Sequence, residues 1–122
     1  MDKKRILIID DDVDLCEGMA DFLMDEGYEV KNTSDPDEGM RWIQQHDFEI
    51  AIFDFKMPRV SGIDLLKSMN QKNPMTKVFI VTGKPFIEKM LKEEKVAHLV
   101  SGVISKPFNH EFFLEKINMA AV

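Results

Sequence analysis

The sequence is poor in cysteine and in basic residues, and it has no long apolar run. No stretch of its 122 residues approaches the ~20 consecutive apolar residues that a membrane-spanning helix needs. The single cysteine excludes an intramolecular disulfide and is typical of a reducing compartment, so we expect a cytoplasmic protein that does not enter a membrane. The 16 Lys and Arg residues are outnumbered by 22 Asp and Glu, giving a net charge of −6. Direct binding of nucleic acid is not expected, because phosphate contacts require clustered basic side chains.

Segments rich in proline, glycine or serine, which often separate domains, are also missing. The six glycines and five prolines are spread along the chain, and 44% of the residues are hydrophobic, enough for one sizeable core. We therefore expect residues 1–122 to form a single domain.

Short apolar runs alternate with helical patterns along the whole chain. The runs that predict strands are Ile6–Ile9, Tyr28–Val30, Ile50–Phe53, Val78–Val81 and Val103–Ile104. Helical spacing of apolar residues predicts one helix that ends at Gly27 and four that begin at Asp35, at Ser61, near Phe86 and at Asn109. Four runs are uninterrupted, as buried strands require, whereas 28–30 alternates like an edge strand.

This alternation of strands and helices, repeated five times, predicts an α/β fold with a parallel sheet and right-handed crossovers. With the second strand at an edge, we expect the doubly wound five-stranded sheet of a flavodoxin-like (βα)5 domain, in the order 2-1-3-4-5. The first and third strands are neighbours in this order. Ligands then bind beyond the carboxyl ends of these strands, where the crossovers leave on opposite faces.

Polar residues follow the strands at this predicted ligand-binding edge. They are Asp10, Asp11 and Asp12 after the first strand, Asp54 after the third, Thr82 after the fourth and Lys106 after the fifth. Two like charges about 4 Å apart repel by roughly 4 kcal/mol at an effective dielectric near 20, so the carboxylates need a cation, a shared proton or solvent. Carboxylates without nearby His or Cys favour Mg²⁺ or Mn²⁺. A carboxylate surrounded by a metal, a hydroxyl and a lysine is typical of an aspartyl-phosphate site.

Over its whole length the chain resembles the receiver domain of two-component response regulators. The matching pieces are ILIIDDD at 6–12, IFDFKMP at 52–58, SG at 61–62, VTG at 81–83 and KPF at 106–108. The resemblance implies a phosphoprotein that receives its phosphoryl group from a sensor histidine kinase or a phosphotransfer protein. It would catalyse only its own phosphotransfer and dephosphorylation. Its output would pass through the face of helix 4, strand 5 and helix 5 to an effector domain or a second copy.

The same resemblance implies roles for the acidic residues. Asp54 would be the phosphoacceptor. Mg²⁺ (or Mn²⁺) would be held by Asp10, Asp11 and Asp54, together with the backbone carbonyl of Lys56.

The tripeptide Lys-Pro-Phe occurs twice, around Lys84 and around Lys106, and the resemblance distinguishes the two copies. Lys106 would be the phosphate-binding lysine, oriented by a cis bond before Pro107, and Thr82 would be the switch hydroxyl. Lys84 is either an exposed loop lysine or, with Lys56 on the other side of the pocket, a shield for the phosphoryl group.

The chain departs from the family in three places. Arg59 and Ser61 stand where Gly and Asp are more usual, which predicts a different turn. The segment 96–102 lacks the usual Gly-Ala pair and is interpreted as either a helix end or an early fifth strand. Val103 replaces a residue that is commonly aromatic, so we expect the response to phosphorylation in the loop Gly83–Phe86.

Other functions remain as alternatives. An aspartate-nucleophile phosphatase of the haloacid dehalogenase group usually needs a second aspartate where this chain has Lys56. A flavodoxin-like cofactor binder needs a phosphate loop where this chain has three carboxylates. A degenerate receiver that acts as an interaction module usually lacks part of the acid, threonine and lysine set. A phosphate sink would need little conformational switching.

Overall fold

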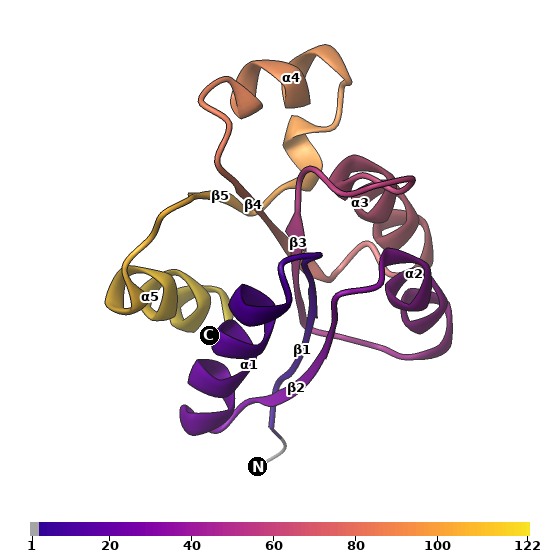
Figure 1. Cartoon of the computed structure of the whole chain (residues 1–122). Coiled ribbons are helices and arrows are strands. Elements are labelled where there is room, and N and C mark those ends of the chain that lie inside the picture. Colours follow the sequence, from indigo (N-terminus) through magenta and orange to yellow (C-terminus); the bar gives the residue numbers. More distant parts are fainter. Residues whose placement is uncertain (1–2) are drawn as a thin grey trace.

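The computed structural model describes residues 3–122, so residues 1 and 2 of the expected domain lie outside the described part (Figure 1). Its strands are β1 (Arg5–Ile9), β2 (Glu29–Thr33), β3 (Ile50–Asp54), β4 (Lys77–Thr82) and β5 (Gly102–Ser105). Its helices are α1 (Val13–Asp25), α2 (Pro36–Gln45), α3 (Gly62–Lys72), α4 (Ile87–Glu93), the short 3-10 helix η1 (Ala97–Leu99) and α5 (His110–Ala120). Within residues 3–122, no helix combines the length and the apolar character needed to cross a membrane.

The five strands form one parallel sheet in the order β2-β1-β3-β4-β5, which confirms the predicted topology. In the register of the central strands, Ile8 lies opposite Asn32 on one side and Ile52 on the other. β2 is an edge strand, as expected, but it extends to Thr33 rather than ending at Val30. The polar residues in its second half concealed this extension, because an edge strand does not need continuous burial.

Helices cover both faces of the sheet (Figure 1), with α1 and α5 on one side and α2 and α3 on the other. Successive strand residues point to opposite faces. In β1, Leu7 and Ile9 therefore pack with α2 and α3, while Ile6 and Ile8 pack with α1 and α5. Helix α4 packs into the core under α2 and α3 through Ile87 and Leu91. The carboxyl ends of the strands lie at one edge of the sheet, between these two layers of helices (Figure 1).

Local signals define the helix ends much as predicted. The side chains of Asp12, Asp35, Ser61 and Asn109 accept backbone hydrogen bonds at the N-termini of α1, α2, α3 and α5. Ser61 also forms a reciprocal capping box with Asp64. Helix α4, by contrast, follows Phe86, whose side chain forms no capping hydrogen bond.

In the segment 96–102, residues 96–101 neither continue α4 nor form a strand, and only Gly102 belongs to β5. Lys95 follows the C-cap of α4 in the left-handed conformation, with a φ of 59°, and Val96 is buried. The 3-10 helix η1 then uses three more residues before β5 begins at Gly102.

Candidate functional site

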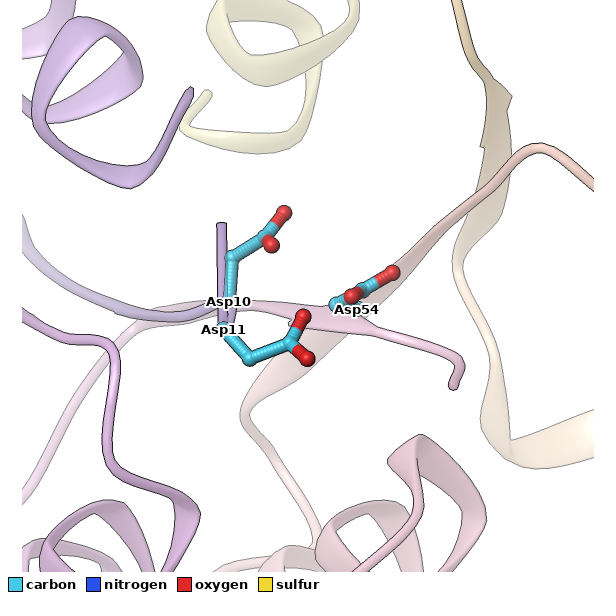
Figure 2. A group of neighbouring side chains, drawn as sticks. All are labelled: Asp10, Asp11 and Asp54. Atoms are coloured by element: carbon cyan, nitrogen blue, oxygen red, sulfur yellow. The ribbon is translucent and has the colours of Figure 1, made fainter. Parts of the chain in front are cut away.

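Three carboxylates meet at the carboxyl ends of the two central strands (Figure 2). Asp10 and Asp11 follow β1, Asp54 ends β3, and each contributes an oxygen within 4.8 Å of the others. Asp10 is fully buried and Asp54 is 7% exposed, whereas Asp11 is exposed. We call these three residues the acidic cluster. Asp12, the last residue of the acidic run, instead caps α1 by accepting a hydrogen bond from the amide of Leu15 at 3.1 Å.

One oxygen of Asp10 is buried without a hydrogen bond. Oδ1 accepts the amide of Asp12 at 2.9 Å. Oδ2 lies 3.3 Å from the ammonium of Lys106 but accepts no hydrogen bond from the described residues. Burial raises the pKa of the Asp10 carboxyl above its usual value. The position of this oxygen therefore favours an additional positive charge.

Lys106, which follows β5, supplies the positively charged side chain of the site. Its Nζ lies 3.2 Å from Oδ1 of Asp54 and 3.3 Å from Oδ2 of Asp10. Burial alone would lower the pKa of Lys106, but the two carboxylates outweigh it and raise the pKa. The bond between Lys106 and Pro107 is cis, as the resemblance implied.

The net charge of the site depends on whether the carboxyl of Asp54 is protonated. Burial, followed by the negative charge of Asp10, raises the pKa of Asp54 from 3.8 to about 7, and Lys106 offsets this only in part. A divalent cation among these carboxylates would shift Asp54 toward its ionised form.

Thr82 ends β4 and is 2% exposed. Its Oγ1 accepts a hydrogen bond from the amide of Lys84 at 3.0 Å, which ties the hydroxyl to the following loop. The side chain of Lys84 is exposed, and Gly83 lies beside the stem of Lys106. Val103 is half-buried opposite Ile80 and packs against the core under α2 and α3.

The loop after β3 is held close to Asp54. The amide of Phe55 bonds to Val81 at 2.9 Å, and the amide of Gly62 bonds back to Phe55 at 2.9 Å. A Cβ on Gly62 would lie 2.6 Å from the carbonyl oxygen of Asp54, so only glycine fits without displacing backbone. In the sequence, Gly62 stands out only as part of the pair Ser61-Gly62, and no local pattern predicts its close approach to Asp54. Lys56 is exposed in this loop.

The acidic cluster fits a small, hard divalent cation. Its donors are all carboxylate oxygens, its three ligand atoms are close together, and the buried Asp10 oxygen has no hydrogen bond. Oxygen-only donor sets of this kind suit Mg²⁺ or Mn²⁺.

Comparison with known proteins identifies the family of the chain. The profile of the response regulator receiver domain matches residues 6–118. A solved receiver domain protein (CheY-like) from Methanospirillum hungatei is 34% identical, has a TM-score of 0.87, and is aligned over 97% of this chain and 93% of its own. The chemotaxis response regulator CheY4 of Vibrio cholerae is 26% identical, with a TM-score of 0.85 over 98% of this chain and 99% of its own.

Among curated proteins, the transcriptional regulatory protein DltR of Streptococcus agalactiae is 27% identical over 118 residues, which are 94% of this chain and 50% of that protein. The chain therefore spans about half the length of this relative.

Proposed function

Because this chain belongs to the response regulator receiver domain family, we propose that it accepts a phosphoryl group on Asp54 from a sensor histidine kinase or a phosphotransfer protein. The observation that carries the proposal is the environment of Asp54, whose buried carboxylate contacts Lys106 and lies beside Asp10 at the end of β3. Residues 1–122 would then form one receiver domain of a two-component phosphorelay.

Asp54 acts as the nucleophile toward the phosphorus of a phosphohistidine. One carboxylate oxygen forms an O–P bond while the P–N bond of the donor breaks, and the imidazole keeps the bonding electron pair and takes up a proton. Lys106, already 3.2 Å from Asp54, pairs with a phosphoryl oxygen, and the hydroxyl of Thr82 donates a hydrogen bond to another.

Mg²⁺ or Mn²⁺ would be held by Asp10, Asp11 and Asp54, with the backbone carbonyl of Lys56 as a further ligand. The cation would supply positive charge that keeps Asp54 ionised and offsets the charge of the incoming phosphoryl group. Asp10 and Asp54 are suited to this role because the fold already holds them side by side.

The residues around this centre modulate it. Lys56 and Lys84 are both exposed in the loops after β3 and β4, where they can limit the access of water to the phosphoryl group. Gly83 gives the second loop its freedom to move, and Pro107 orients Lys106.

The output passes through the face of α4, β5 and α5, to an effector domain or to a second copy of the chain. Met90 of α4 and Phe112 of α5 are exposed apolar side chains of these helices. The transcriptional regulatory protein DltR is about twice as long as this chain, which supports an effector domain as the partner. The half-buried Val103 favours a second function, a phosphate sink that needs little switching.

Catalysis is limited to the chain's own phosphotransfer and dephosphorylation. A phosphatase with an aspartate nucleophile would use an acid two residues after Asp54, and the exposed Lys56 occupies that position. This substitution argues against turnover of a separate substrate.

Incubation with a small acyl phosphate, followed by intact mass measurement, tests the proposal. We expect one phosphoryl group on the wild type in the presence of Mg²⁺, little without the metal, and none on Asp54→Asn. Labelling of Asp54→Asn to the wild-type extent would contradict the assignment.

A further inference from the structure

Arg59, in the loop between β3 and α3, has an unusual backbone conformation. Its φ is 67°, in the left-handed region that non-glycine residues rarely adopt. The amide of Val60 donates to the carbonyl of Pro58 at 2.8 Å, so Arg59 is the middle residue of a tight, strained three-residue turn. Glycine would adopt this turn without strain. The presence of arginine therefore calls for a compensating contact of its side chain.

That contact is an ion pair with α2. Nη2 of Arg59 lies 2.6 Å from Oδ2 of Asp37, in the first turn of the helix. Within residues 3–122, this is the one side-chain hydrogen bond or ion pair between residues 56–60 and another element. The side chains are 67% and 50% exposed, so the pair adds little to global stability. Its effect is on the loop that it holds.

The same end of α2 is also connected to the acidic cluster. The amide of Asp35, the cap of α2, donates to Oγ1 of Thr33 at 3.1 Å. The carbonyl of Thr33 accepts the amide of Asp10 at 3.2 Å. The start of α2 is thus fastened to the strand end that carries Asp10 and, through Arg59, to the loop that carries Lys56.

We infer that Arg59 is a positioning residue, whose ion pair with Asp37 holds the β3–α3 loop so that the carbonyl of Lys56 faces the metal site. This inference rests on the proposed metal-dependent phosphotransfer. Without the pair, the loop would have to lose more conformational freedom when the cation binds, and the affinity for Mg²⁺ would fall.

The charges of the two partners separate positioning from simple electrostatics. Removing the positive charge of Arg59 makes the surroundings of the site more negative, so electrostatic attraction alone would tighten Mg²⁺ binding. Removing the negative charge of Asp37 would weaken it by the same reasoning. Positioning predicts weaker binding for both, so Arg59→Gln is the decisive variant.

Calorimetric titration with Mg²⁺ tests the inference on the wild type, Arg59→Gln, Asp37→Asn and the exchanged pair Arg59→Asp/Asp37→Arg. We expect each single variant to bind about three- to tenfold more weakly and the exchanged pair to recover most of the affinity. Lys67→Gln is the matched control, because it breaks an exposed ion pair with Glu94 and removes one positive charge outside this loop. Its affinity should equal that of the wild type or exceed it slightly.

Unchanged or tighter binding by Arg59→Gln, with normal binding by the wild type, would overturn the positioning role alone. A wild type that neither binds Mg²⁺ nor accepts a phosphoryl group would overturn the proposed function as well. The two failures are therefore distinguishable in one set of titrations and mass measurements.

Discussion

Lys106 and Asp54 come from strands that are not neighbours, yet Nζ of Lys106 lies 3.2 Å from Oδ1 of Asp54. Strand β4 separates β5 from β3, so the lysine side chain extends past the end of β4, where Thr82 lies. The contact brings one copy of the Lys-Pro-Phe tripeptide to the acidic cluster. The other copy, around Lys84, stays exposed.

Alanine variants of the two lysines should therefore differ. We expect Lys106→Ala to slow phosphorylation of Asp54 by about ten- to a hundredfold, because a charge-assisted contact of this kind contributes about 1.5–3 kcal/mol. Lys84→Ala should leave this rate nearly unchanged and alter mainly the rate of dephosphorylation. Time courses of intact mass measure both rates. Equal effects of the two variants would contradict the assignment of Lys106, rather than Lys84, as the phosphate-binding lysine.

The stability of the metal-free domain should fall as the pH rises from about 4 to about 7. Because the pKa of Asp54 is raised from 3.8 to about 7, the folded state holds a proton that the unfolded chain has released in this range. Thermal unfolding with a chelator, at several pH values, isolates the effect as the difference between wild type and Asp54→Asn.

We expect Asp54→Asn to be the more stable protein at about pH 8, by a few degrees, since 1 kcal/mol corresponds to roughly 4 °C in a domain of this size. Mg²⁺ should raise the melting temperature of the wild type more than that of the variant. A difference between the two proteins that does not change with pH would be inconsistent with the raised pKa.

Gly62→Ala should disturb Asp54 from outside the acidic cluster. The added methyl group would lie 2.6 Å from the carbonyl oxygen of Asp54 and 2.9 Å from Cα of Phe55, both of them backbone atoms. We expect a loss of about 1–3 kcal/mol in the free energy of unfolding and slower phosphorylation. Gly18→Ala is the control, because a Cβ there meets nothing within 4 Å and helical alanine is preferred over glycine. If both variants retain wild-type stability, the close approach at Gly62 is unimportant.

A phosphoryl mimic should change the loop after β4 rather than the fifth strand. Val103 is too small for a ring-sized rearrangement, while Thr82 is bonded to the amide of Lys84, so movement of the hydroxyl draws the loop with it. Amide exchange with and without beryllium fluoride should show changes across residues 83–90. Asp54→Asn, treated in the same way, is the control. Changes confined to residues 54–60 would instead favour a phosphate sink.

The strands, the order of the sheet and the residues at the strand ends could be predicted from the sequence alone. Uninterrupted apolar runs identify buried parallel strands, and capping residues such as Asp35 and Ser61 identify helix starts, because these signals act over a few residues. The carboxyl ends of parallel strands meet at one edge, so the convergence of Asp54 with Asp10 followed from topology.

Only the tertiary structure shows which residues adjacent in the sequence have different roles and which distant residues form a contact. Asp12 belongs to the same acidic run as Asp10, but it caps α1, because the chain turns into the helix at that residue. The ion pair of Arg59 with Asp37 joins the β3–α3 loop to α2 across 22 positions, and no pattern in the sequence indicated it. Such contacts depend on how packed layers place side chains in space, and no short-range pattern in the sequence encodes that placement.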